Sequence, residues 1–201
     1  MDKDTIRIAL KEAVYQRRST RLYTTQPVPE ELLEEVIDAG RHAASAMNAQ
    51  TTHLIVITNP EKLAQLREVM TGVLAGLTEK EGMSANFVKL IRRAKEGQLV
   101  DVAYGSPALI VTANKKGSQN AVADCSCVLA NMMLTASACG LGNCWINQFH
   151  MTNEIPQVQD FFAGLGVAGD ESVFGALALG YAEKLETTPL PRKGNPVTYI
   201  K

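Results

Sequence analysis

Four short apolar runs lie between helical segments, and this order constrains the fold more than any other feature of the sequence. The runs cover residues 53–58, 107–113 and 173–181, and one more starts within 140–147. Runs of this length that are rich in branched aliphatic side chains predict buried strands. Apolar spacing predicts helices over about 5–18 and 32–39, over 61–100 with breaks at Gly72, Gly76 and Gly82, and over 120–139. Asn153 can cap a further short helix that runs through Phe161. Because helices and strands are mixed without strict alternation, the pattern favours an α+β fold over a doubly wound sheet.

The length of 201 residues and the lack of internal repeats predict a single domain over 1–201. A formal net charge of −1 argues against a nucleic-acid partner, because phosphate-backbone affinity needs many cationic contacts. We find no apolar run long enough to span a bilayer and no signal-peptide core, so we expect a cytoplasmic protein without a membrane partner. The tail over 187–201 contains three prolines and should be extended, and residues 197–200 could pair as an edge strand.

Three arginines and two hydroxyl residues occur together at 17–21, where the first predicted helix ends. The guanidinium group of arginine matches phosphate oxygens with a rigid fork of donors. Arg192 and Lys193, on the proline-stiffened tail, are a candidate second arm of a phosphate clamp. The alternatives are a solvated helix end, where cations complement the helix dipole, and a solvated tail.

The usual catalytic motifs are missing from the sequence, which points to a cofactor that brings its own reactivity. No G-x-G-x-x-G sequence follows a strand, no P-loop is present, and the three histidines have no metal-ligand spacing. Four cysteines lie close together at 125, 127, 139 and 144, in C-x-C and C-x4-C spacing. We interpret them as small buried side chains, while a four-cysteine metal module stays open as an alternative.

Together these segments resemble the FMN-dependent nitroreductase family, which also holds flavin reductases and NAD(P)H oxidases. Four elements carry the resemblance, in the same order along the chain. Residues 17–21 (RRSTR) resemble the family's R-x-S-x-[RK] element, and residues 44–50 (ASAMNAQ) resemble its small-residue loop with Asn and Gln. Residues 124–147 resemble its long helix followed by a G-L-G turn, and residues 180–193 resemble its closing strand with a basic tail. The chain departs from many relatives at Thr51-Thr52, where they have Pro-Trp, and it is short between 60 and 105.

The resemblance implies a central, mainly antiparallel sheet between helical layers and an FMN site at the interface of a homodimer, with the C-terminal strand exchanged. The implied FMN-binding residues are Arg17, Arg18, Ser19, Arg21, Ala44, Ser45, Ala46, Asn48, Trp145, Ile146, Asn147, Arg192 and Lys193. Within this set, Arg17 and Ser19 would hold the phosphate, with Arg192 and Lys193 closing on it, and Arg21 would reach the pyrimidine edge of the flavin. Ser45, Ala46 and Asn48 would come from the partner subunit. Residues 145–147 would lie along one face of the ring.

The implied activity is hydride transfer from NADH or NADPH, through flavin N5, to a small acceptor such as a nitroaromatic or a quinone. The donor and the acceptor would use the same space in turn, so the mechanism would be ping-pong. No side chain is expected to act as a catalytic nucleophile, and no metal is expected. A flavin-binding protein with little turnover, acting as a sensor or a store, is the alternative on the same fold.

Overall fold

The computed structural model describes residues 2–184, 186 and 188–201. Its helices and strands follow the order α1 (Lys3–Gln16), α2 (Glu30–Arg41), β1 (His53–Ile57), α3 (Pro60–Gly76), α4 (Ala85–Lys95), β2 (Ala108–Lys115), α5 (Ala121–Ala138), β3 (Gly142–Ile146), α6 (Gln148–Met151), α7 (Pro156–Ala163) and β4 (Glu171–Gly180), with a short 3₁₀ turn, η1 (Ala46–Asn48), before β1.

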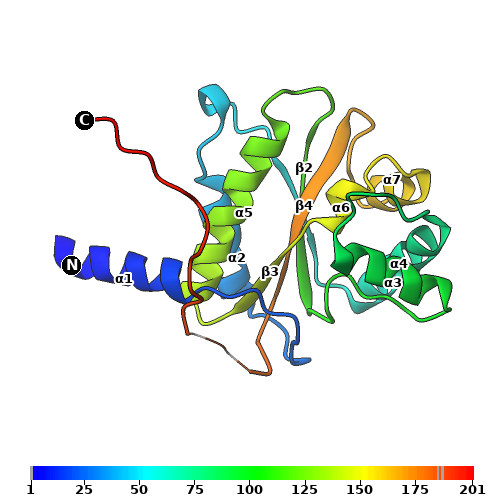
Figure 1. Cartoon of the computed structure of the whole chain (residues 1–201), viewed down its shortest axis with the longest axis horizontal. Coiled ribbons are helices and arrows are strands. Elements are labelled where there is room, and N and C mark those ends of the chain that lie inside the picture. Colours follow the sequence, from blue (N-terminus) through cyan, green and yellow to red (C-terminus); the bar gives the residue numbers. More distant parts are fainter. Residues whose placement is uncertain (1, 185, 187) are drawn as a thin grey trace.

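The four strands form one antiparallel sheet in the order β1-β2-β4-β3, and helices cover both of its faces (Figure 1). One face packs on α2 and α5, through buried side chains such as Leu129, Met132 and Leu177. The other face packs on α3, α4, α6 and α7, through residues such as Met70 and Phe162. This architecture confirms the predicted α+β class and the antiparallel sheet between two helical layers.

Helix α5 is the central helix of the α2 side. Among the described residues it is the one helix that is long and apolar enough to cross a membrane, so the expectation that no apolar run has this length was wrong. Its buried side chains recur every three or four residues, and they face the sheet and α2. Gly40 allows the close approach of α2, since a Cβ there would lie 2.8 Å from Cγ of Met132. Helix α5 is therefore a core helix of this domain.

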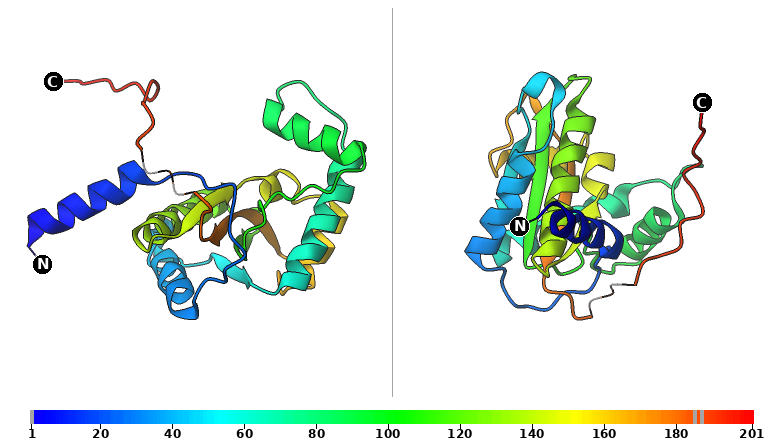
Figure 2. Two further views of the ribbon diagram at one scale, coloured as in Figure 1. Left: turned by 90° about the horizontal axis from the view of Figure 1, so that it is seen from below. Right: turned by 90° about the vertical axis from the view of Figure 1, so that its left-hand side faces the viewer.

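Helix α1 and the C-terminal tail extend away from the rest of the molecule (Figures 1 and 2). No residue of α1 is buried, and Ile6, Leu10 and Val14, which share one face of the helix, are 49%, 58% and 42% exposed. The tail is exposed from residue 188 to the end, and Ile200 is 97% exposed. In the described part of the chain, residues 197–200 pair with no strand, so the strand exchange stays a prediction.

Two local predictions were wrong. Gly72 does not break α3, because a helical glycine costs only about 1 kcal/mol and the buried side chains Met70, Val73 and Leu74 flank it. Helix α7 begins after Ile155, with Pro156 in its first turn, and is not capped by Asn153. The Asn153 side chain instead donates to the carbonyl of Val173, 3.0 Å away.

Candidate functional site

The segment that carries the arginines lies along the outer edge of β3. Ser19 forms an isolated parallel bridge with Asn143, and the Thr20 N–H donates to the Asn143 carbonyl over 2.8 Å. Gly142 makes this contact possible, since a Cβ there would lie 2.7 Å from Oγ1 of Thr20. A second bridge, between Tyr23 and Ala182, fixes the segment beyond the end of β4. The end of α1 is thereby held against the turn that joins α5 to β3.

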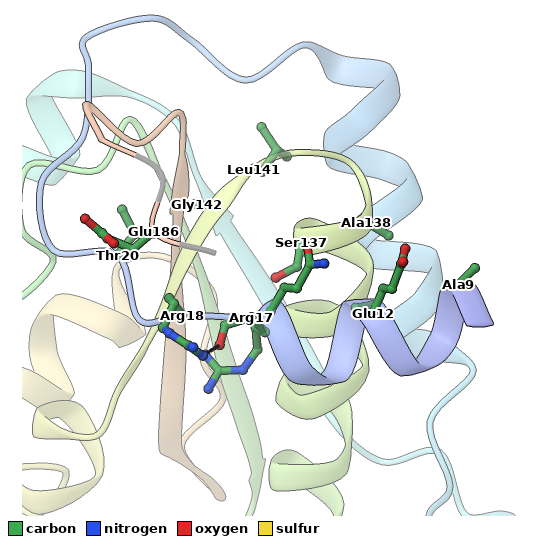
Figure 3. Close-up of a pocket in the computed structure, with 12 residues that line it drawn as sticks. Ala9, Glu12, Arg17, Arg18, Thr20, Ser137, Ala138, Leu141, Gly142 and Glu186 are labelled. Carbon is green, nitrogen blue, oxygen red and sulfur yellow. Dashed lines mark hydrogen bonds between the residues drawn. The ribbon is translucent and has the colours of Figure 1, made fainter. Parts of the chain in front are cut away.

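Arg17 and Arg18 line a cavity of about 320 Å³ between α1 and that turn. Figure 3 shows their guanidinium groups side by side at the end of α1. Nη1 of Arg17 and Nη2 of Arg18 are buried and have no hydrogen-bond partner among the described residues. The other nitrogen of Arg18, Nη1, donates to the Arg17 carbonyl over 2.8 Å and so caps the end of the helix. Buried guanidinium donors without a partner are costly, so the cavity favours a ligand that accepts hydrogen bonds.

The cluster is positively charged, and among the described residues no carboxylate forms an ion pair with it. Burial lowers the pKa of Arg17, and the nearby charges of Arg18 and Arg192 lower this pKa further. Glu12 and Glu186 also line the cavity. In the described part of the chain, however, no ion pair involves any of the cationic site residues, which are Arg17, Arg18, Arg21, Arg192 and Lys193. Arg192, from the other end of the chain, is near enough for its charge to act on Arg17, but it does not line the cavity. Lys193 is exposed and has no hydrogen bond there.

Cys144 of β3 is buried beside the arginine segment. Burial raises the pKa of its thiol, while Arg21, Ser19 and Arg17 act in the opposite direction, which places all three around it. The guanidinium carbon of Arg21 lies 5.9 Å from the centre of the Tyr104 ring, within range of a cation–π contact. Tyr104 has a left-handed backbone (φ 61°) and was not a predicted site residue. Because position 104 holds a tyrosine and not a glycine, the sequence gives no sign of this left-handed conformation.

The three predicted residues after Cys144 differ in accessibility. Ile146 is fully buried, so its side chain is part of the core and only its backbone could contact a ligand. Trp145 is half-buried, and its Nε1 is buried without a hydrogen-bond partner. Asn147 is exposed and stands immediately before α6. The end of β3 therefore presents backbone groups and one polar side chain next to the arginine segment.

The other predicted segment, residues 44–50, lies in a different cavity. Ser45, Asn48 and Gln50 line a groove of about 480 Å³ bounded by the end of α2, by β1 and by α5. No residue lines both this groove and the arginine cavity. Within one chain the structure does not bring the two halves of the predicted site together.

The cysteines show no metal-site arrangement. Cys125 and Cys144 are buried, Cys139 is half-buried, and Cys127 is exposed. Across residues 2–184, 186 and 188–201, no three His, Cys, Asp or Glu side chains are grouped so that they could hold a metal ion. The geometry gives no support to the four-cysteine alternative.

Comparison with known proteins identifies the fold and the family. The family model described as "Nitroreductase family" matches residues 14–181. A crystal structure of a nitroreductase with bound FMN from Bacteroides fragilis is 30% identical, covers 96% of this chain and 98% of its own, and superposes with a TM-score of 0.84. A nitroreductase with bound FMN from Desulfitobacterium hafniense shares the fold at 22% identity, with a TM-score of 0.79 and coverage of 96% of this chain and 98% of its own.

A curated protein of Archaeoglobus fulgidus, named "Putative NADH dehydrogenase/NAD(P)H nitroreductase", is 27% identical over 172 residues, which is 84% of this chain and 82% of that protein. The match of the family model extends from the end of α1 to the residue after β4, and so includes the arginine segment, the loop over 44–50 and the α5–β3 turn. The chain belongs to the nitroreductase family.

Proposed function

We propose that this protein is an FMN-dependent oxidoreductase that passes hydride from NADH or NADPH to a small acceptor such as a nitroaromatic or a quinone. Bound FMN would supply the hydride chemistry at its N5 atom, which no side chain can provide. Three findings support the proposal: membership of the family, the FMN in the B. fragilis structure, and the nicotinamide donor in the name of the A. fulgidus protein.

The observation that carries the proposal is the pair of buried, unpartnered guanidinium nitrogens of Arg17 and Arg18. Phosphate oxygens accept charge-assisted hydrogen bonds, and their negative charge would relieve the repulsion between Arg17, Arg18 and Arg192. We assign Arg17 and Ser19 to the phosphate, with Arg192 and Lys193 closing on it from the tail.

The flavin ring would lie beyond the phosphate, over the end of β3. We assign Arg21 to the pyrimidine edge, where its cation would favour negative charge on the reduced ring. The backbone of residues 145–147 would orient one face of the ring, and Trp145 and Asn147 would border it. Nicotinamide donor and acceptor would bind in turn on the other face, which gives ping-pong kinetics.

A homodimer would complete the site. The loop over 44–50 lies in a separate groove of its own chain, so Ala44, Ser45, Ala46 and Asn48 would serve the partner's cofactor. The exposed apolar face of α1 and the extended tail are unfavourable in an isolated chain, and a second copy would bury them. Within the described residues β1 ends the sheet with a free outer edge, where a strand from the partner could add. A stable monomer in analytical ultracentrifugation would contradict this assembly.

The visible spectrum of the purified protein, followed under anaerobic NADH or NADPH, tests the activity. We expect flavin absorbance that bleaches with the donor and returns with a quinone or a nitroaromatic. Flavin absorbance that does not bleach would identify a flavin store, and a protein that cannot be loaded with FMN would overturn the proposal.

The double variant Arg17→Ala with Arg21→Ala tests the site itself. Removing two charge-assisted hydrogen bonds should weaken FMN binding by at least about 100-fold. Arg93→Ala is the matched control, since Arg93 is exposed and bonds only Gln98 of its own segment, and it should leave FMN binding unchanged. Unchanged FMN affinity in the double variant would show that the arginine cluster has another role.

A further inference from the structure

The Asp124 side chain is buried in the first turn of α5, yet it bonds outside its own helix. Asp124 is 6% exposed, and its Oδ1 accepts a hydrogen bond of 3.0 Å from the backbone N–H of Ala46. The N-terminal end of a helix favours a negative charge, so the carboxylate is well placed in this turn. The bond connects the core helix of the domain to the loop over 44–50, across 78 residues of sequence.

That loop has a backbone conformation that its own residues do not favour. Met47, Asn48 and Gln50 have φ values of 51°, 54° and 51°, in the left-handed region. Asparagine tolerates this region, whereas Met47 and Gln50 held there each cost on the order of 1 kcal/mol or more. Met47 is also 98% exposed, so its side chain does not anchor the loop in the core. Hydrogen bonds of the loop are therefore the contacts that oppose this cost.

The hydrogen bonds of the loop are of two kinds. Within it, the Gln50 N–H donates to Oγ of Ser45 over 3.0 Å, and Nε2 of Gln50 donates to Oδ1 of Asn48 over 3.1 Å. From outside it, Asp124 is the one side chain, among the described residues, that hydrogen-bonds any residue from 45 to 50. The internal bonds set the shape of the loop, and the bond to Asp124 sets its position on the body of the protein.

We propose that Asp124 is a positioning residue that holds the loop over 44–50 ready for the cofactor. The inference rests on the proposed function, in which this loop contacts FMN. Because Oδ1 of Asn48 accepts from Gln50, its Nδ2 donors would be left for a ligand atom that accepts, such as a flavin carbonyl or ring nitrogen. Without Asp124 the loop would sample other conformations, and FMN would have to order it on binding.

Asp124→Ala and Asp124→Asn, compared with Asn131→Ala, test the inference. Asparagine keeps an oxygen acceptor for the Ala46 N–H, whereas alanine removes it. Asn131 provides the matched control, since it is on the same helix and its Nδ2 donates to the Ala39 carbonyl, outside the loop. The measurements are hydrogen exchange at the Ala46 amide in the FMN-free protein and the Kd for FMN by fluorescence titration.

We expect Asp124→Ala to speed exchange at Ala46 and to weaken FMN binding by about tenfold, the effect of one charge-assisted hydrogen bond. Asp124→Asn should stay within about threefold of the wild type in both measurements, because the acceptor is retained. Asn131→Ala should leave exchange at Ala46 and FMN affinity near the wild-type values.

Wild-type FMN affinity in Asp124→Ala, or an equal loss in Asn131→Ala, would overturn the inference while leaving the proposed function intact. Failure of the wild-type protein to bind FMN would instead overturn the proposed function, and the exchange measurement would still show whether Asp124 holds the loop.

Discussion

Arg17 and Arg18 are neighbours in the sequence, but their guanidinium groups have different hydrogen-bond partners. Arg18 donates through Nη1 to the Arg17 carbonyl, where α1 ends, while its buried Nη2 has no partner among the described residues. Arg17 makes no side-chain hydrogen bond among the described residues, and burial and neighbouring cations lower its pKa. The helix-end interpretation therefore fits Nη1 of Arg18, and the buried nitrogens without partners support the proposed phosphate contact.

Glu171 gives a prediction about pH at the same scale. Burial alone would raise the pKa of its carboxyl, but hydrogen bonds from the His53 ring (2.9 Å) and the Ala168 N–H (3.1 Å) hold this pKa below its usual value. A lowered pKa in the folded state stabilises the protein above the unfolded pKa, about 4.3 for Glu, and the contribution is lost as pH falls through the folded pKa.

We therefore expect Glu171→Gln to lower the unfolding free energy by about 1 kcal/mol near neutral pH, or roughly 2–4 °C in Tm. The difference from the wild type should shrink as the pH falls below about 4.3 and through the lower folded pKa, below which both proteins carry a neutral side chain at 171. Thermal unfolding followed by circular dichroism across this pH range measures it. Glu81→Gln, in an exposed turn, is the control and should change little at any pH. A difference that does not vary with pH would contradict the assignment.

At the scale of elements, the contact between the arginine segment and β3 depends on a single missing side chain. A Cβ on Gly142 would lie 2.7 Å from Oγ1 and 2.9 Å from Cγ2 of Thr20. Gly142→Ala should therefore push the segment away from β3, with a cost of about 1–3 kcal/mol in unfolding free energy. FMN affinity should fall as well, because Arg17 and Ser19 move with Thr20.

Adding Thr20→Ala to Gly142→Ala removes both clashing atoms and should restore most of the FMN affinity. Gly76→Ala is the matched control: nothing lies within 4 Å of a Cβ there, so helix α3 should be unchanged or slightly stabilised. Calorimetry for unfolding and fluorescence titration for FMN provide the two readouts. Tight FMN binding by Gly142→Ala alone would show that the segment does not need this contact.

The elements that the sequence predicted are those whose signal is local. β1 and β4 correspond to the predicted apolar runs at 53–58 and 173–181, and α5 corresponds to the predicted helix over 120–139. A continuous apolar run can be recognised in the sequence without knowing which distant residues it packs against. The short helix α6, the left-handed residues of the 44–50 loop and Tyr104 were not predicted. Their conformations are imposed by tertiary contacts, such as the bond from Asp124 to Ala46, that a single sequence does not reveal.

At the scale of the whole molecule, the two halves of the proposed site lie in separate cavities of one chain. The arginine cavity contains Arg17 and Arg18, and the groove of the loop contains Ser45 and Asn48. Family resemblance named all four residues, but only the structure shows this separation. The proposed dimer site would explain why a single chain holds two incomplete halves, together with an exposed apolar helix face and tail.

Mixed dimers test this arrangement directly. If each site takes Arg17 from one subunit and Asn48 from the other, a dimer of one Arg17→Ala chain and one Asn48→Ala chain has both substitutions in the same site, and its other site is intact. Two affinity tags and sequential purification would isolate this mixed dimer. We expect FMN titration to give one tight site per mixed dimer and none in either variant homodimer, since each lost contact weakens binding by about tenfold or more. A site formed within a single chain would leave the mixed dimer without any tight site, because each chain would carry one substitution.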